Sequence, residues 1–262
     1  MISVLTIAGV VWLEVLRRKD VYVLFILLAA FLLVLLTLDV FGLGGVVGYV
    51  KEIGLLLAWI FSWILAVTVS VRQLPREEER GTMFPLLAKP VTRWSLIIGK
   101  WLGAWSIVMA ATAVFYVFLV GIVILRGGGF GTAVLVQALV LHLGLLGIIT
   151  ALGILFSTRL NGDASAALTL VVTLTAYLVL PSVPGLILNE HGLRRTCLLV
   201  LYYALPHLKL FDLRQRLVYN YDPVSAATWL QVALYGAILM ALLLLLAWMA
   251  YRKKRLVRGA LL

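Results

Sequence analysis

Six stretches, each long enough to cross a bilayer, contain no aspartate, glutamate, lysine or arginine. Crossing the hydrocarbon core takes roughly 20 apolar residues. No soluble core can hide so many apolar side chains, because a soluble surface needs polar cover. The chain is therefore expected to be an all-α polytopic membrane protein. Its six predicted transmembrane helices are Val21–Leu38, Ile53–Val71, Trp101–Leu125, Ala133–Phe156, Ala164–Leu188 and Trp229–Tyr251.

The composition argues against a disulfide-bonded protein, a cysteine-based metal protein and a nucleic-acid-binding protein. Hydrophobic residues make up 64% of the 262 residues and charged residues only 13%. Cys197 is the only cysteine, so no internal disulfide and no cysteine-based metal cluster can form, and no metal site is expected. The net charge of +11 would raise the question of nucleic acid in a soluble protein. Here the basic residues flank the apolar stretches, so we expect the lipid bilayer and not nucleic acid as their partner.

The distribution of basic residues predicts the orientation. If the N-terminus is inside, fifteen lysines and arginines lie in inner segments and seven in outer ones. Five of those seven lie in one long loop, 189–228, which counts for less in the positive-inside rule. Both termini are thus expected in the cytoplasm, and 189–228 is expected to be extracytoplasmic. Its apolar run Cys197–Leu205 is too short to span and is expected to rest on the membrane surface or to re-enter it partway.

Residues 1–18 are expected to form an interfacial helix. On a helical wheel, the polar residues of this segment fall within one arc, and Leu5, Trp12, Leu13 and Leu16 lie outside it. An amphipathic helix of this kind lies in the headgroup layer with its apolar face toward the acyl chains.

Several catalytic and ion-coupling patterns are missing from the sequence. Ion-coupled transporters usually place ionisable groups inside the membrane, but the predicted spans contain only His142. We interpret this histidine as a hydrogen-bonded structural residue. The sequence contains no P-loop, no G-x-S-x-G and no H-E-x-x-H. A membrane enzyme is therefore the least favoured class, and energy for transport is expected to come from another subunit.

The predicted cytoplasmic loop 72–94 has an unusual pattern. Pro75 suits the first turn of a short helix, and the following acids Glu77–Glu79 favour the helix dipole. Gly81 can end that helix, Thr82 can cap an apolar turn that runs to Ala88, and Thr92 can cap the next span. A plain membrane anchor does not need three consecutive acids. Such acids suit a surface that binds a basic partner. The loop is therefore expected to dock a partner.

The residues of this loop resemble the permease subunit of type-2 ABC exporters. That family shows acids, Gly-Thr, a Leu pair, a proline, a Ser/Thr-Arg pair and Gly-Lys in this order. The matching positions are Glu77, Glu78, Glu79, Gly81, Thr82, Leu86, Leu87, Pro90, Thr92, Arg93, Gly99 and Lys100. The interruption Met83-Phe84-Pro85 departs from the more continuous helix expected there.

The resemblance implies a single permease domain over residues 1–262, with the loop 72–94 carrying a coupling helix that docks on an ABC ATPase. The predicted docking residues are Glu77, Glu78, Glu79, Arg80, Gly81, Thr82, Leu86, Leu87 and Arg93. Two ATPase copies would bind ATP and magnesium, so the chain itself would need no cofactor and would not be an enzyme. A second permease chain, identical or paralogous, would complete the path, and an extracytoplasmic subunit is a further expected partner. The location would be the inner or plasma membrane of a bacterium or archaeon. The alternatives are an ion-coupled secondary transporter and a non-transporting membrane assembly factor.

Two further pairs of residues are expected to shape the membrane domain. Gly99 and Gly103 form a G-x-x-x-G at the start of the third span, a spacing typical of close helix packing. Pro181 and Pro184 interrupt the backbone hydrogen bonds near the outer end of the fifth span. They are expected either to shape an outer gate or simply to end the helix.

Overall fold

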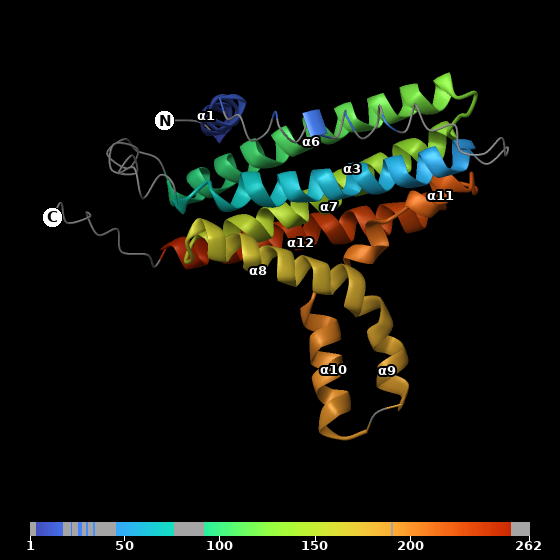
Figure 1. Ribbon diagram of the computed structural model, residues 1–262. Helices are drawn as coiled ribbons and strands as arrows, with labels where there is room; N and C mark the ends of the chain where they lie inside the picture. The colour runs from blue at the N-terminus through green and yellow to red at the C-terminus, as the bar shows by residue number, and fades with distance from the viewer. Residues whose placement is uncertain are drawn as a thin grey trace.

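The computed structural model describes residues 4–17, 22, 26–27, 30, 34, 46–75, 92–189 and 191–252, and their regular structure is helical throughout (Figure 1). Five described helical stretches are long and apolar enough to cross a membrane. They are α3 (Val46–Val71), α6 (Arg93–Leu125), α7 (Thr132–Ser157), the broken stretch that starts with α8 (Gly162–Leu174), and α12 (Ala226–Arg252). The predicted first span, Val21–Leu38, lies mostly outside the described residues.

The long helices lie side by side, and α7 is at the centre of the bundle. It contacts α3, α6, α8 and α12, and most of its residues are buried. Small residues allow these close approaches. A side chain at Gly147 would lie 2.5 Å from Met240 Sδ of α12 and 3.0 Å from Trp105 Nε1 of α6. Two of the buried hydroxyls inside the bundle donate to carbonyls of their own helices, Thr112 to Val108 and Thr169 to Ser165.

The helix ends follow from local chemistry. Thr92 caps α6, as predicted: its Oγ accepts from the backbone N–H of Ser95 at 3.1 Å. Asn161 caps α8 in the same way by accepting from Ala164 N at 3.0 Å. The turn between α6 and α7 contains Gly127 at φ +76°, a conformation that favours glycine. We call the side of the bundle with this turn the far end and the opposite side, near the start of α6, the α1 end.

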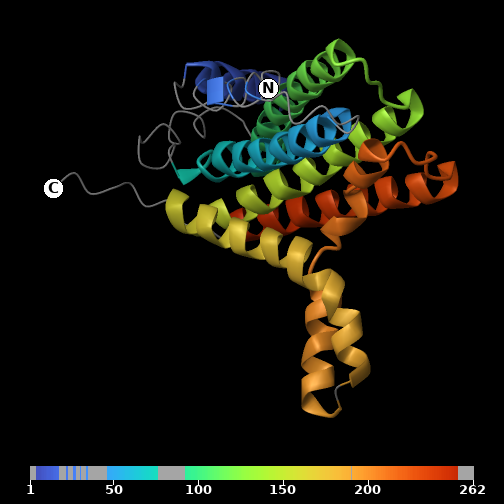
Figure 2. The ribbon, with the colours of Figure 1, turned by 45° about the vertical axis from the view of Figure 1, so that its right-hand side comes forward.

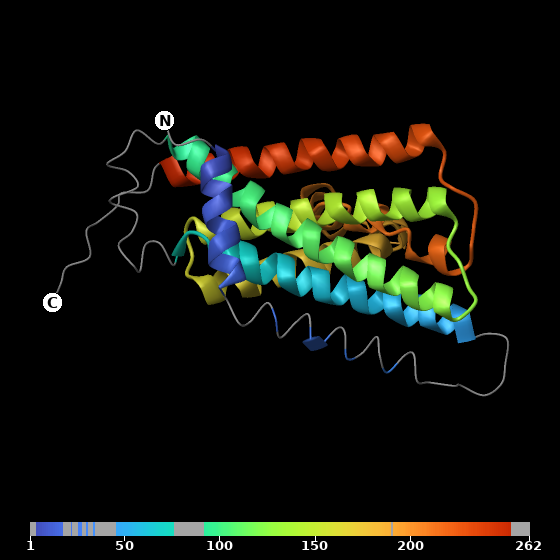
Figure 3. The same ribbon diagram turned by 90° about the horizontal axis from the view of Figure 1, so that it is seen from above.

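Helix α1 (Val4–Leu16) lies crosswise to the bundle at the α1 end (Figure 3). One face of α1 packs on α6 through Ile7, Val11 and Val15, all buried. The opposite face is also apolar, with Leu5 and Leu13 exposed at 72% and 59%. A helix that lies across the spans and exposes leucines has the geometry expected of an interfacial helix.

The second span begins earlier than predicted. Lys51 and Glu52 were expected in a loop before Ile53, but both lie inside α3. Lys51 is tolerated there because its ammonium donates to Asn220 Oδ1 at 2.9 Å and lies 4.8 Å from the centre of the Phe130 ring. A buried cation with these partners does not have to end a helix. The predicted span was started after the charged residues, so its start was placed too late.

After α8 the chain leaves the side of the bundle. Helix α8 continues through a π turn, η1 (Thr175–Val179), and a 3₁₀ turn, η2 (Leu180–Ser182), into α9 (Val183–Asn189). A helical hairpin of α9 and α10 (Leu193–Ala204) then projects away from the other helices (Figures 1 and 2). No residue of α10 is buried. The run Cys197–Leu205 therefore stands off the bundle as part of α10 and its end.

It is the next segment that returns into the bundle. The re-entrant segment, Leu208–Val218, consists of η3 (Leu208–Phe211) and α11 (Arg214–Val218) and packs against α3 and α7. Leu208, Phe211 and Leu217 are each at most 1% exposed. With α10 it forms a pair bent by 41°, which is either a broken sixth span or a re-entrant loop.

Candidate functional site

The predicted docking residues fall into two groups. Most of them lie outside the described residues, which resume at Thr92. This first group is Glu77, Glu78, Glu79, Arg80, Gly81, Thr82, Leu86 and Leu87. Arg93 is described, and it forms part of a contact that joins three segments at the α1 end.

Two arginines hold the last turn of α12. Arg93 Nη1 donates to the carbonyls of Tyr251 at 3.1 Å and Arg252 at 2.6 Å. Arg159, in the turn between α7 and α8, donates to the carbonyl of Ala250 at 2.9 Å. Cations near a helix C-terminus satisfy its last carbonyls and offset the helix dipole. We call this arrangement the arginine clamp; it joins the start of α6, the α7–α8 turn and the end of α12.

The glycine pair of α6 is where α1 packs. A side chain at Gly99 would lie 2.7 Å from Ile7 Cβ, and one at Gly103 would lie 2.7 Å from Val11 Cβ. Real Cβ atoms do not approach so closely, so only glycine allows α1 to lie this near α6. Trp12 Nε1 adds a hydrogen bond to Ser106 Oγ at 2.8 Å. The pair thus serves packing inside one chain, next to the arginine clamp.

The two prolines lie at the base of the hairpin. Pro181 is in the 3₁₀ turn η2 and Pro184 in α9, and both are exposed. The regular α-helix has already ended at Leu174, before either proline is reached. The prolines thus lie where the hairpin leaves the bundle.

A cluster of charged groups lies inside the bundle, and we call it the buried charged cluster. The carboxylate of Asp212 accepts from Arg214 Nε and Nη2, each at 3.0 Å, and from Lys209 Nζ at 3.0 Å. The backbone N–H of Arg214 donates to the same carboxylate at 3.1 Å, and Tyr177 OH donates to its Oδ2. The side chains of Asp212 and Arg214 are only 5% and 20% exposed. A carboxylate with this many donors is held strongly in its charged form.

The cluster reaches the middle of α3. The Arg214 guanidinium lies 4.6 Å from the centre of the Trp59 ring. Trp59 is roughly 20 Å along α3 from its first residue, at about 1.5 Å per residue. Trp59 also contacts His142, whose ring stacks on it at 4.4 Å between centres. Charge therefore lies about as deep as the midpoint of a span.

His142 itself is satisfied by neutral groups. Its Nε2 is 3.0 Å from Ser62 Oγ and its Nδ1 is 3.1 Å from Tyr116 OH. Both ring nitrogens therefore have hydroxyl partners inside the bundle. This arrangement is the one expected of a structural histidine, and the structural role itself stays a prediction.

The buried charged cluster was not predicted from the sequence. No charged group was expected near mid-span, and that expectation is wrong because the charges come from the 189–228 loop and not from the spans. The signal was present as Lys209, Asp212 and Arg214 within six residues, surrounded by apolar residues and following Pro206. Their partner Tyr177 is more than 30 residues away in sequence, and only the fold brings it there.

A bundle of membrane-length helices, a crosswise N-terminal helix and a re-entrant segment define a polytopic helical membrane protein. The family model of the ABC-2 family transporter proteins matches residues 5–256, nearly the whole chain. The chain therefore belongs to the ABC-2 family, and it is a multi-pass ABC transporter permease. Members of this family are transmembrane components that in general work with an ABC ATPase. No curated protein matches the chain.

Proposed function

We propose that this chain is the permease of a type-2 ABC exporter. ATP hydrolysis in a separate ATPase subunit would drive movement of the membrane helices and export a cargo or act on an extracytoplasmic partner. The observation that carries the proposal is the organisation of the α1 end. The segment that joins Pro75 to Thr92 leaves and rejoins the bundle there, beside the arginine clamp. A push on this segment would reach the start of α6 and, through the hydrogen bonds of the clamp, the end of α12 and the α7–α8 turn.

The complex would contain two permease chains and two ATPase subunits. The permease chains would be two copies of this one, or this one and a paralogue. Among the described spans, the apolar windows of α3 and α7 are 67% buried, but those of the α8 stretch and α12 are only 28% and 22% buried. This uncovered side supports a second permease chain beside them, with lipid around the pair. The α1 end would face the cytoplasm of a bacterium or archaeon, as would both termini.

The buried charged cluster is the one observation that favours an ion-coupled secondary transporter. Asp212 already accepts from two basic side chains, a tyrosine and a backbone amide. Releasing a proton or a cation from such a carboxylate would require breaking these bonds in every cycle. Its partners therefore favour a structural or binding role over ion coupling.

Reversing the charge of the docking acids is expected to weaken ATPase binding. The triple variant Glu77→Lys, Glu78→Lys, Glu79→Lys should lose about 2 kcal/mol of docking free energy, about thirtyfold in affinity, if the acids meet basic groups on the ATPase. The measurements are permease abundance, ATPase copurification and permease-stimulated ATP hydrolysis, with native mass spectrometry to count subunits. Abundance should stay normal while copurification and stimulation fall.

Asp222→Lys is the matched control, because it reverses an exposed acid between α11 and α12 near the far end. It should leave all three quantities unchanged. Normal copurification and stimulation in the triple variant would show that these acids are only solvated. The docking surface would then have to include Met83–Ala88 or the α7–α8 turn. A wild-type chain that recruits no ATPase would favour a non-transporting assembly factor.

Cysteine labelling is expected to place the α1 end in the cytoplasm. In a Cys197→Ser background, Arg80→Cys and Arg255→Cys should react with a membrane-impermeant thiol reagent only after the membrane is opened. Gly192→Cys should react in intact cells. The native Cys197 is exposed in α10 and should behave like the Gly192 position in the unmodified protein. Labelling at position 80 from outside would reverse the proposed orientation.

A further inference from the structure

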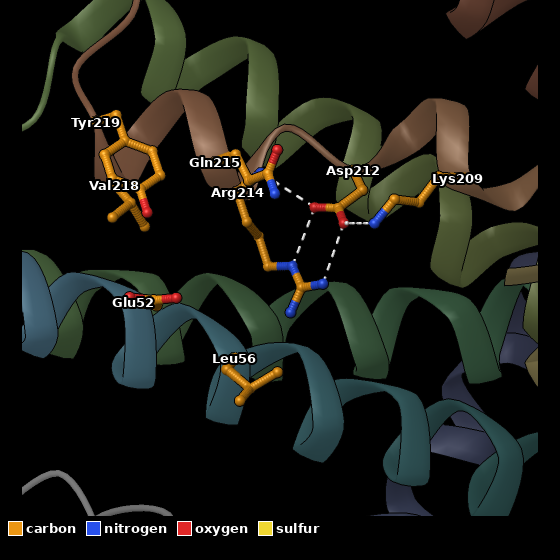
Figure 4. Close-up of a pocket in the computed structure, with 8 residues that line it drawn as sticks. All are labelled: Glu52, Leu56, Lys209, Asp212, Arg214, Gln215, Val218 and Tyr219. Carbon is orange, nitrogen blue, oxygen red and sulfur yellow. Dashed lines mark hydrogen bonds and ion pairs between the residues drawn. The ribbon is translucent and has the colours of Figure 1, made fainter. Parts of the chain in front are cut away.

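A cavity of about 230 Å³ opens between α3 and the re-entrant segment (Figure 4). Glu52 and Leu56 of α3 form one wall. The other wall is built by Lys209, Asp212, Arg214, Gln215, Val218 and Tyr219. Glu52 lies only six residues after the start of α3, so the cavity is nearer the far end than the α1 end.

The two walls carry opposite charge. On the re-entrant wall, Lys209 and Arg214 share the single carboxylate of Asp212, which leaves a surplus of one positive charge. Lys209 remains 51% exposed, so its ammonium can also contact a ligand. On the α3 wall, Glu52 is exposed. A simple anion would be repelled by Glu52 and a simple cation by the basic wall, whereas a group that carries both charges suits both walls.

An apolar strip continues from the cavity along α3. Leu56, Ile60 and Ile64 are spaced four residues apart, so they lie on one face of the helix. They are 44%, 45% and 40% exposed. The polar cavity therefore lies at one end of a strip of exposed aliphatic side chains. A molecule that fits both features has a charged head and an apolar tail.

We propose that this cavity binds the zwitterionic headgroup of an amphipathic molecule such as a phospholipid. Its ammonium contacts Glu52, its phosphate or carboxylate contacts Lys209 and Arg214, and its apolar chain lies along Leu56, Ile60 and Ile64. The proposed binding site is inferred from the geometry of the cavity and the strip, and it does not depend on the exporter function. That the bound molecule is the cargo, or resembles it, rests on the exporter function proposed above.

The test compares four ligands on the purified full-length chain by native mass spectrometry and equilibrium binding. They are phosphatidylethanolamine, phosphatidylglycerol, diacylglycerol and water-soluble phosphoethanolamine. Phosphatidylethanolamine should bind about tenfold more tightly than phosphatidylglycerol, which lacks the ammonium. Phosphoethanolamine shares the headgroup but has no tail and should bind more weakly. Diacylglycerol has the tails without the charges and should also bind more weakly.

Glu52→Gln should weaken phosphatidylethanolamine binding about threefold to tenfold and leave phosphatidylglycerol binding unchanged or stronger. The matched control Asp222→Asn removes an exposed acid outside the cavity and should change neither. Lys209→Gln should weaken both phospholipids, and thermal unfolding should show that each variant is folded. Equal binding of the two phospholipids, or an equal effect of Glu52→Gln and Asp222→Asn, would overturn the proposal. Phosphoethanolamine binding as tight as the lipid would overturn the role of the apolar strip.

These outcomes separate the cavity from the exporter function. If lipid selectivity is absent but the ATPase still copurifies, the cavity proposal fails and the exporter proposal stands. If lipid selectivity is present but no ATPase copurifies, the binding site stands and the bound molecule is not cargo.

Discussion

Asp212→Ala is expected to lower the free energy of unfolding by about 3–5 kcal/mol, because it leaves Arg214 without its carboxylate inside the bundle. The side chains of Asp212 and Arg214 are 5% and 20% exposed, so water replaces little of the lost interaction. Lys209 is half exposed and should add little. The free energy of unfolding is measured by thermal or denaturant titration of the purified protein in detergent. We expect the re-entrant segment to detach first.

The control for this change removes both charges. Asp212→Ala combined with Arg214→Met should recover part of the lost stability, because no unpaired charge then remains. Asp222→Ala, at an exposed acid, should have almost no effect. A loss of less than about 1 kcal/mol in the single variant would mean that water reaches Arg214 freely, contrary to its low exposure.

Gly103→Leu is expected to displace α1 and to destabilise the protein by about 3 kcal/mol, the upper end for overpacking. The first added atom would lie 2.7 Å from Val11 Cβ and 3.0 Å from the backbone oxygen of Ala8. Backbone atoms cannot rotate away as a side chain can, so α1 must move as a whole. Trp12 would then lose its bond to Ser106, and labelling of a cysteine introduced at Val11 should rise sharply.

Gly121→Leu provides a matched control on the same helix. Nothing lies within 4 Å of a side chain built at Gly121, and leucine has a higher helix propensity than glycine. This variant should be as stable as the wild type or more so. If Gly103→Leu behaves like Gly121→Leu, α1 is not held against α6 in the membrane.

The sequence predicted the long helices well because their apolar residues are continuous. Three predicted spans overlap α7, the α8 stretch and α12 closely, and two more correspond to α3 and α6, which both begin before their predicted spans. The start of α3 was predicted too late because Lys51 was taken as a boundary. Its burial depends on Asn220, which is 169 residues away, and no local pattern reports such a partner.

The candidate site was less predictable, because most of its contacts join residues that are far apart in the sequence. Thr92 could be assigned as a cap because capping depends on neighbours three residues away. The cluster around Asp212 depends on residues from α3 and η1 that the fold brings to the re-entrant segment. Arg93 was predicted as a docking residue, but its hydrogen bonds to α12 could not be predicted from the motif. The docking role itself stays a prediction.

The arginine clamp has a mechanical consequence. Because Arg93 and Arg159 both hold the last turn of α12, the ends of three segments share one pivot and cannot slide past one another there without breaking these bonds. Flexing must then occur farther along the chain, and the π turn Thr175–Val179 is the place where regular α-helical bonding stops. That turn stands between α8 and the hairpin. Force that arrives at the pivot therefore reaches the hairpin through a joint, which can change the direction of a movement as well as transmit it.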